Sequence, residues 1–251
     1  MLLGLAVTAH AATTITEQNL AYYWNFNDNT SAATLTGVVS NTSNGASISA
    51  GSLPKTWSAD GSKADDGYIT TGTSSGNQNA LKMSSMTGSS ISLQNFSISL
   101  DIKDYAGGAV LFNINNRQTL NTSLGIWGGG GTASGAGAIE SSSEWATYVF
   151  SFSGNTMTVY RNGVQVHTLT GETLSGSLTS LTLGNDSSNE GNAAIKASLD
   201  NLAIWNKAMN ADDAMLLYQS DTPNQLVPEA ATASLGLLGV AMLLGLRRRA
   251  A

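Results

Sequence analysis

The chain has 251 residues, of which 41% are hydrophobic and only 11% are charged, and its formal net charge at pH 7 is −6. It contains no cysteine, which excludes disulfides, thiolate metal sites and cysteine nucleophiles. The excess of acidic residues also argues against nucleic acid as a partner, because a nucleic-acid-binding surface needs basic residues to neutralise phosphates.

Residues 1–11 have the features of a short signal peptide. An apolar run extends from Leu2 to Ala9, and Ala9 and Ala11 place small residues at the minus three and minus one positions of a signal-peptidase site. Cleavage there leaves Ala12 as the new N-terminus. No lysine or arginine precedes the run, so we expect the true start to lie upstream of Met1. A buried N-terminal strand is the alternative interpretation.

Alternating apolar and polar residues predict β-strands over most of the next 200 or so positions. Half-buried strands are expected at Tyr22–Phe26, Phe96–Ile102, Val110–Ile114, Tyr148–Phe152 and Leu181–Leu183. The many Gly, Ser, Thr and Asn residues suit short strands joined by tight turns. We therefore expect one all-β domain over residues 12–221.

The clearest hairpin joins Met157–Arg161 to Val164–Thr168 through Asn162 and Gly163. These two residues tolerate the positive φ angles that both central positions of a type I′ turn require. The pattern therefore predicts a two-residue turn between two adjacent antiparallel strands.

One helix is predicted near the end of this domain. Asn210 is a suitable N-cap, and Asp212 and Asp213 in the first turn face the positive end of the helix dipole. Ala214, Leu217 and Tyr218 then share one face. We expect that face to pack on the sandwich.

The C-terminal residues form a separate segment after a short linker, 222–226. Val227, Pro228 and Glu229 precede an apolar run from Ala230 to Leu246, and Arg247, Arg248 and Arg249 follow it. At ~1.5 Å per residue this run gives about 25 Å of helix, close to the ~30 Å core of a bilayer. The arginines favour the cytoplasmic side, so the rest of the chain is expected outside the inner membrane. A buried core helix and a permanent anchor are the alternatives.

The order of Pro-Glu, apolar span and basic cluster over residues 227–251 resembles the PEP-CTERM sorting signal of Gram-negative-type bacteria that make exopolysaccharide. The resemblance implies a transient inner-membrane anchor that an exosortase-type membrane protease removes. It also implies that the mature protein reaches the cell surface or the extracellular matrix.

Six short patterns follow one another in the region between the two terminal segments. They are Ala21–Asn27, Trp57–Gly61 with Gly67–Ile69, Asn95–Leu100, Glu144–Phe150 with Val159–Gly163, Leu181–Asn185, and Leu199–Met209. In this order they resemble the laminin-G-like domain of the concanavalin A-like lectin and glucanase superfamily. The resemblance implies a two-sheet antiparallel jelly roll with one short C-terminal helix, to which the separate transmembrane helix is added.

Aromatic residues next to glycine- and serine-rich loops are candidates for stacking on sugar rings. Trp57 and Trp127 have that environment. Trp145 and Trp205 lie within strand-like patterns and are expected to pack in the core or at its edge. Met83 and Met86 are expected to fill gaps in the core.

The laminin-G-like resemblance also implies one structural calcium ion, held by acidic side chains and backbone carbonyls at the rim. By position, the matching acids are Asp28 and Asp200. Asn27 stands where the family usually has an acid. A calcium ion needs about six to eight oxygen ligands, so further groups would have to complete the site.

Residue types that catalysis needs are scarce. His167 is the only histidine after residue 11, so a histidine-rich zinc site is excluded and a serine triad is unfavourable. Glu140 and Glu144 would lie ~13 Å apart along a strand, too far for either glycosidase mechanism. The sequence therefore predicts a protein that is not an enzyme.

Two functions remain open from the sequence. One is an exported module that binds a glycan, such as the exopolysaccharide of its own cell. The other is a structural or adhesive surface protein that binds no glycan. A glycan-active enzyme of the same superfamily is the third and least favoured alternative.

Overall fold

The computed structural model describes residues 15–26, 47–50, 55–58, 68–71, 80–84, 86, 90–105, 110–115, 118–121, 126–127, 139, 142–171, 174–184, 197–220, 223 and 226. The predicted signal peptide, Asp28 and the sorting tail 227–251 lie outside these residues. Within the described ranges, no helix has the length and apolar character needed to span a membrane. Export, sorting and anchoring therefore stay predictions.

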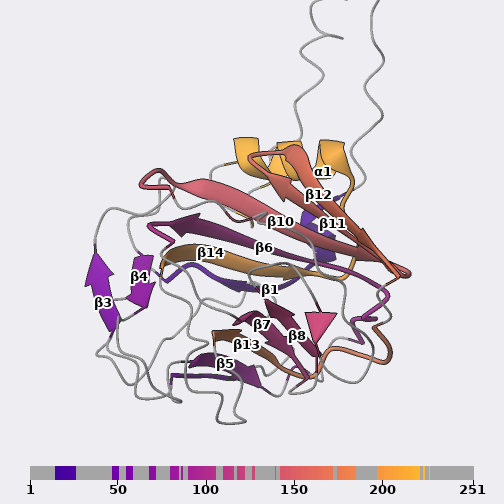
Figure 1. The fold of residues 1–251 in the computed structure, drawn as a ribbon, viewed down its shortest axis with the longest axis horizontal. Coiled ribbons are helices and arrows are strands. Elements are labelled where there is room, and N and C mark those ends of the chain that lie inside the picture. Colours follow the sequence, from indigo (N-terminus) through magenta and orange to yellow (C-terminus); the bar gives the residue numbers. More distant parts are fainter. Residues whose placement is uncertain are drawn as a thin grey trace, which may run out of the picture.

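Two antiparallel sheets lie face to face, and a helix covers the outer side of the larger one (Figure 1). The larger sheet has the order β12 (Val164–Thr170), β11 (Thr156–Arg161), β10 (Ala146–Ser153), β6 (Asn95–Lys103), β14 (Ser198–Trp205), β4 (Tyr68–Thr71) and β3 (Lys55–Ser58), with β1 (Leu20–Trp24) also paired to β14. The smaller sheet has the order β2 (Ser47–Ala50), β5 (Ala80–Ser84), β13 (Leu181–Gly184), β7 (Val110–Ile114), β8 (Gln118–Asn121) and β9 (Ile126–Trp127). The described helices are the short 3-10 helix η1 (Glu17–Asn19) and α1 (Ala211–Gln219). This all-β arrangement with one short α-helix confirms the predicted sandwich.

The inner core lies between the two sheets and contains the side chains that the alternation predicted to be buried. Phe112 of β7 meets Phe150 of β10 edge to face across the sandwich, with ring centroids 5.2 Å apart. Phe96 and Phe152 stack on neighbouring strands of the larger sheet at 4.5 Å. Met83 and Met86 are fully buried in the same core, as predicted.

The larger sheet differs from the prediction because the outer face of β6, β10 and β14 is buried as well. Ser97, Ser99 and Asp101 alternate with the apolar residues of β6, yet all three are at most 2% exposed. The segment around α1 covers them, and it supplies hydrogen bonds in place of water: Ser97 Oγ donates to the carbonyl of Lys207 at 2.8 Å. The expectation of half-buried strands was therefore wrong for β6, and it was wrong for β1 and β10, which are buried along almost their whole length.

Trp205 illustrates how the outer layer is built. It is fully buried, as predicted, and its indole Nε1 donates to Ser99 Oγ at 3.0 Å. Ser151 on β10 similarly donates through Oγ to the carbonyl of Met209 at 2.8 Å. Short hydroxyl side chains thus bond the sheet to the chain that runs into α1, because a buried polar group must find a partner.

Helix α1 begins as the sequence predicts. The Asn210 side chain accepts the N–H of Asp213 at 2.9 Å, and Asp213 Oδ2 accepts the N–H of Asn210 at 3.2 Å, which completes a capping box. The buried face consists of Asp213, Ala214, Leu216 and Leu217. Tyr218 was predicted on this face but is 41% exposed, because the helix turns it away from the sheet.

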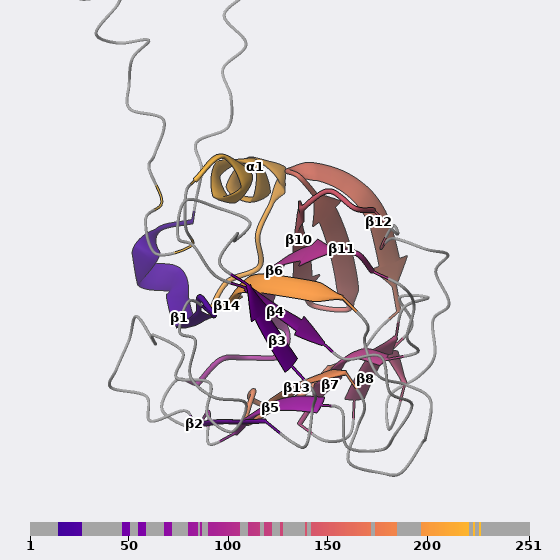
Figure 2. The ribbon, with the colours of Figure 1, turned by 90° about the vertical axis from the view of Figure 1, so that its left-hand side faces the viewer.

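Both ends of the described body meet beside α1 (Figure 2). Ile15 and Leu226 belong to the same cluster of buried residues as Leu216 and Leu217, and the N–H of Ile15 donates to Asp213 Oδ1 at 2.6 Å. Pro223 and Leu226, in the stretch predicted as a linker, are buried. The packed body therefore includes residues of that stretch.

The hairpin between β11 and β12 has the predicted turn. Asn162 and Gly163 have φ angles of 50° and 77°, as a type I′ turn requires. A Cβ atom at Gly163 would lie 2.8 Å from the Cα of Met215 in α1. The turn therefore lies directly against the helix, and only glycine leaves room for this contact.

Candidate functional site

A bulge in β14 organises the polar groups on the outer face of the larger sheet. Asp200 pairs with Asp101 of β6, while the next paired residue on β14 is Ala203, opposite Ser99. Two residues of β14 therefore oppose one of β6, which defines a bulge, and Asn201 adopts a φ angle of 50° within it. The bulge brings consecutive polar side chains into one buried cluster.

The Asn201 side chain connects this cluster. Its Nδ2 donates to Asp101 Oδ2 at 3.2 Å, and its Oδ1 accepts the hydroxyl of Tyr23 from β1. The backbone N–H of Asn201 donates to Asp200 Oδ1 at 2.8 Å. The polar atoms at the centre of the bulge are therefore engaged with one another.

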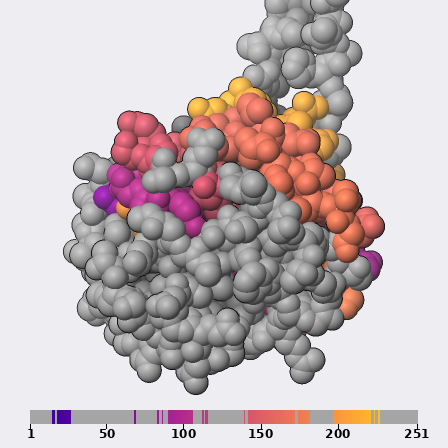
Figure 3. Space-filling model, viewed as in Figure 1, coloured from indigo at the N-terminus to yellow at the C-terminus, as the bar shows by residue number. Residues whose placement is uncertain are grey.

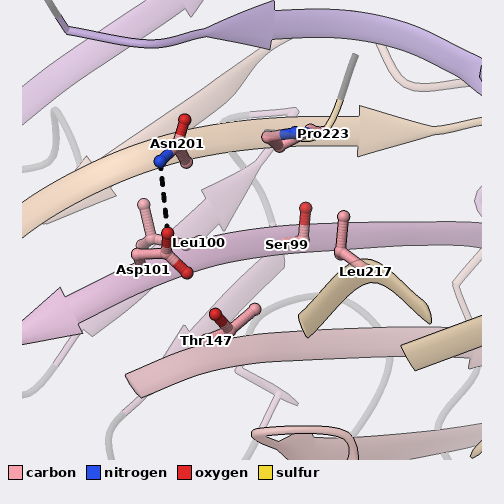
Figure 4. A pocket seen from close by; sticks show the side chains of 7 residues that line it. All are labelled: Ser99, Leu100, Asp101, Thr147, Asn201, Leu217 and Pro223. Atoms are coloured by element: carbon pink, nitrogen blue, oxygen red, sulfur yellow. Dashed lines mark hydrogen bonds between the residues drawn. The ribbon is translucent and has the colours of Figure 1, made fainter. Parts of the chain in front are cut away.

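A small cavity, here called the outer-face cavity, opens beside this cluster (Figure 4). Figure 4 shows its lining side chains, from β6, β10, β14, α1 and the chain after α1: Ser99, Leu100, Asp101, Thr147, Asn201, Leu217 and Pro223. Its volume of about 10 Å³ gives room for about one water molecule. A sugar ring is far too large for this cavity, so it can hold only a water or a small ion.

A half-buried aromatic pair lies on the same outer face. The rings of Tyr68 and Trp145 meet edge to face, with centroids 5.2 Å apart and planes inclined by 83°. The Nζ atom of Lys103 is 4.8 Å from the centroid of each ring, within the range of cation–π attraction. We call Tyr68, Lys103 and Trp145 the aromatic–lysine cluster.

Strand register explains why the cluster and the cavity share a face. Trp145 is two residues from Thr147, and Lys103 is two residues from Asp101. Alternate residues of a strand point to the same side, so Lys103 lies on the outer face of β6 with Asp101. Trp145, directly before β10, is placed on that face by its contacts with Tyr68 and Lys103. In Figure 3 the magenta and rose surfaces, which belong to the segments around the end of β6 and the start of β10, adjoin at the upper left.

The chain before Trp145 is fixed to the end of β6. The N–H of Asp104 donates to the carbonyl of Ser142 at 2.7 Å, and the Ser142 hydroxyl accepts the N–H of Glu144 at 3.0 Å. These bonds hold the indole of Trp145 over the strand end. Helix α1 lies over the other end of the sheet, so the cluster stays partly exposed.

The two tryptophans predicted to stack on sugars lie on edge strands of different sheets. Trp57 is in β3, where its Cα partner is Ile69 of β4. Trp127 is in β9, at the edge of the smaller sheet, with Thr119 as its Cα partner. The described backbone therefore does not join them in one site, and β3 is the strand next to Tyr68.

The predicted calcium ligands can be compared with the geometry only at Asp200. This residue is fully buried, and its Oδ1 is engaged by Asn201. Asp101 is its cross-strand neighbour, but the described residues contain no group of three or more His, Cys, Asp or Glu side chains suited to a metal. They alone do not fit a calcium ion, so a calcium site depends on Asp28 and other residues outside the described ranges.

The residues weighed for catalysis are dispersed. His167 is half-buried in β12, and its Nε2 has no hydrogen-bond partner among the described residues. Glu144 is exposed before β10, and Glu140 lies outside the described residues. The described part of the chain therefore does not assemble the acid pair that was considered from the sequence.

Tyr68 and Lys103 were missed from the sequence, and Trp145 was assigned to packing. The alternation of inward and outward residues along the strands does indicate that Trp145 and Lys103 lie on the outer face. Tyr148, Phe150 and Phe152 point inward, so the odd-numbered Trp145 belongs to the opposite face. The same alternation places Lys103 outside, opposite to Leu100 and Ile102 of β6.

Comparison with protein families gives one match. The model of the concanavalin A-like lectin/glucanases superfamily matches residues 81–215, which is more than half of the chain. The matched range contains Lys103 and Trp145 of the aromatic–lysine cluster. A search of the curated proteins found no match.

Several solved structures share the fold. Domain 4 of the extracellular arabinanase AbnA from Geobacillus stearothermophilus, solved with arabinotriose, aligns with a TM-score of 0.58 at 17% identity, covering 80% of this chain and 98% of that domain. The binding domain of Paraclostridial Mosquitocidal Protein 1 aligns at 0.57 and 14% identity, covering 80% of this chain and 52% of the other. Trypanosoma rangeli sialidase, in complex with the inhibitor DANA, aligns at 0.55 and 9% identity, covering 84% and 36% respectively. At these identities the likeness concerns the fold.

Proposed function

Because the chain belongs to the concanavalin A-like lectin/glucanases superfamily, we propose that it is a non-catalytic protein that binds carbohydrate outside the cell. The observation that carries this proposal is the half-buried Tyr68–Trp145 pair at the rim of the outer face of the larger sheet. Aromatic rings present apolar faces with negative charge density, which suit the C–H-rich faces of sugar rings.

The similar solved structures support this proposal at the level of the fold. The arabinanase domain, which this chain matches over nearly the whole length of that domain, was solved with arabinotriose. The fold can therefore present a surface to a short saccharide. Since function depends on the particular site and not on the fold, the sugar must be identified from this chain's own residues.

The sequences at the two ends of the chain support a further proposal, that the protein is exported from the cell. Ala9 and Ala11 supply the signal-peptidase pattern, and Val227, Pro228 and Glu229 begin the sorting pattern. We expect export, transient anchoring through residues 230–246, and release by an exosortase-type protease. Mass spectrometry of the protein from the matrix fraction tests this: a mature chain that still carries Arg247–Arg249 would contradict removal of the tail.

Carbohydrate binding is tested on a glycan array with the purified protein and single alanine variants. We expect Trp145→Ala to abolish binding, and Trp57→Ala to weaken it if the site continues from β4 onto β3. Trp127→Ala tests the other predicted position, on the smaller sheet. Val166→Ala, an exposed change on β12, serves as the control and should bind like the parent protein. A folded protein that binds no glycan on the array would contradict the proposal.

A structural or adhesive surface protein is the second candidate function. The observation that favours it is that Trp57 and Trp127, the two tryptophans predicted to stack on sugars, lie on strands of different sheets. In that case the sandwich acts as a stable body whose surface contacts other matrix components. Retention in the extracellular matrix by a protein that binds no glycan would support this function over the first.

One structural calcium ion is proposed separately, on the basis of the family resemblance at Asp28 and Asp200. Binding to the folded state alone would raise its stability by mass action. We expect EDTA to lower the melting temperature and added calcium to restore it, as measured by differential scanning fluorimetry. An unchanged melting temperature in both conditions would contradict the ion.

A further inference from the structure

The ammonium group of Lys103 is held over two aromatic rings, and the Lys103 side chain is partly exposed. Its Nζ atom is equally distant, at 4.8 Å, from the ring centroids of Tyr68 and Trp145. Among the described side chains, Lys103 forms no ion pair with a carboxylate. The rings restrain the charge without neutralising it, and Lys103 itself is half-buried at the rim. A restrained, unneutralised cation suits an anionic ligand.

The geometry combines two kinds of recognition within a few ångströms. The rings of Tyr68 and Trp145 provide apolar surface on which a sugar ring can stack. Lys103 provides charge-assisted N–H donors next to that surface. A pyranose that carries a carboxylate uses both features at once, whereas a neutral sugar uses only the rings.

In the described part of the chain, two exposed carboxylates are sequence neighbours of the cluster. Asp104 follows Lys103, and Glu144 precedes Trp145, and both are exposed. Together with the net charge of −6, they oppose the approach of a polyanion at low ionic strength. Salt screens this repulsion over ~10 Å at 0.1 M, while direct contact with Lys103 is screened less. The site therefore fits one acidic sugar residue and not a long run of anionic charge.

From these contacts we infer that the aromatic–lysine cluster binds a sugar residue bearing a carboxylate, either a hexuronic acid or a sialic acid. The inference rests on the proposed carbohydrate binding, and it adds the position of the site and the class of sugar. Trp145 and Tyr68 hold the ring of the sugar, and Lys103 binds the carboxylate.

The test uses an array of uronic-acid and sialic-acid oligosaccharides, each printed beside its carboxyl-reduced counterpart. We expect the parent protein to bind at least one acidic oligosaccharide about tenfold or more tightly than the reduced form, as one charge-assisted contact provides. Lys103→Met should remove this preference and keep weak binding to both forms, while Lys103→Arg should restore the preference. Binding to the uronic-acid oligosaccharides or to the sialic-acid oligosaccharides shows which of the two acids the cluster recognises.

Two further variants test whether a change in binding comes from this cluster or from a general change in charge or folding. Trp145→Ala should lose binding to both the acidic and the reduced forms. Lys207→Met, which removes another half-buried lysine of the outer layer, should leave the preference intact. Thermal unfolding of each variant checks that the sandwich is folded, and we expect Lys103→Met to change the melting temperature little because the side chain is partly exposed.

The outcomes distinguish this inference from the function on which it rests. Equal binding to acidic and reduced sugars, or an unchanged preference in Lys103→Met, would overturn the inference while carbohydrate binding stands. Binding that is lost only in Trp57→Ala or Trp127→Ala would overturn it in the same way. A folded protein that binds none of the printed sugars would contradict the proposed function as well as the inference.

Discussion

Asn201 stabilises the bulge of β14 through both its backbone and its side chain. Its φ angle of 50° is one that asparagine and glycine adopt more readily than other residues. Its amide bonds to Asp101 and Tyr23, and both partners are buried. A change here affects backbone strain and hydrogen bonding separately, so two substitutions can measure the two contributions.

We expect Asn201→Gly to reduce the free energy of unfolding by about 1–3 kcal/mol, because a buried carboxylate and a buried hydroxyl lose a partner. Asn201→Ala should cost about 1–2 kcal/mol more, since alanine is strained at positive φ. Urea unfolding at equilibrium measures both. Equal stability of the two variants would show that backbone strain at this position is negligible.

Tyr160 links stability to alkaline pH. Burial, and to a smaller extent the charge of Asp213, raise the pKa of Tyr160 above its ordinary value of 10.0. The unfolded chain therefore releases this proton at a lower pH than the folded protein. The contribution to stability is fully present below pH 10 and is lost as the pH rises through the folded pKa.

Tyr160→Phe should flatten this part of the pH dependence. Above pH 10 the parent protein should lose stability more steeply than the variant, as followed by urea unfolding between pH 8 and 11 at intervals of about 0.5. The difference between the two proteins removes the contribution of the other tyrosines. Parallel pH profiles would contradict the raised pKa of Tyr160.

At the scale of elements, the stability of helix α1 depends on the hydrogen bonds of its first turn. Asn210 and Asp213 form the capping box, and Asp213 also accepts the N–H of Ile15. The helix is nine residues long, which is too short to be stable alone in water. Its cap and its packing on the larger sheet must therefore supply its stability.

Asn210→Ala should lower the free energy of unfolding by about 0.5–2 kcal/mol through loss of the cap. Gln219→Ala, at an exposed position in the last turn, is the matched control and should stay within about 0.5 kcal/mol of the parent protein. Chemical denaturation followed by tryptophan fluorescence measures both. An effect of Asn210→Ala no larger than that of the control would contradict the role of the cap.

The elements themselves were largely predictable, because apolar residues that recur at every second position over β6 and β10 are typical of a strand and do not fit the 3.6-residue period of a helix. The burial of both faces was not predictable. The alternation places Ser97 and Ser99 on the outer face of the sheet. It does not show whether water or another segment of the chain forms hydrogen bonds with them. The described segment 206–220, which covers them, acts through backbone carbonyls such as that of Lys207, which every residue type possesses.

The candidate site was less predictable than the fold for a related reason. Trp145, Lys103 and Tyr68 come from three segments that are distant in the sequence, and only the strand order β10-β6-β14-β4 brings them together. The loops beside Trp57 and Trp127 predicted these two residues instead. The alternation along β10 indicates that Trp145 faces outward, but only the sheet topology shows that it meets Tyr68.

At the scale of the whole molecule, the end of the described body contributes to its stability. Leu226 is 7% exposed and packs in the outer layer with Ile15 and Leu216. Burial of a leucine side chain stabilises a protein by about 1.5–3 kcal/mol. The stretch predicted as a linker therefore carries part of the folding free energy.

A chain that ends at Ser220 should unfold at a lower denaturant concentration than one that ends at Leu226, by an amount equivalent to about 1.5–3 kcal/mol. Leu226→Ala in the full chain isolates the contribution of the side chain and should account for most of the difference. Equal midpoints for the two shortened chains would contradict packing of the segment. The comparison with the full chain shows whether residues 227–251 add anything to the stability of the body.

The meeting of the two ends beside α1 has a consequence for engineering and for evolution. Ile15 and Leu226 lie in one cluster of buried residues, so a short peptide can join them without crossing the sandwich. The order of the strands in the gene can then be changed while their order in the sheets is kept. A circular permutant reopened at the exposed turn of Gly154 and Asn155 should fold, and the same closeness lets the whole sandwich be inserted into a surface loop of another protein.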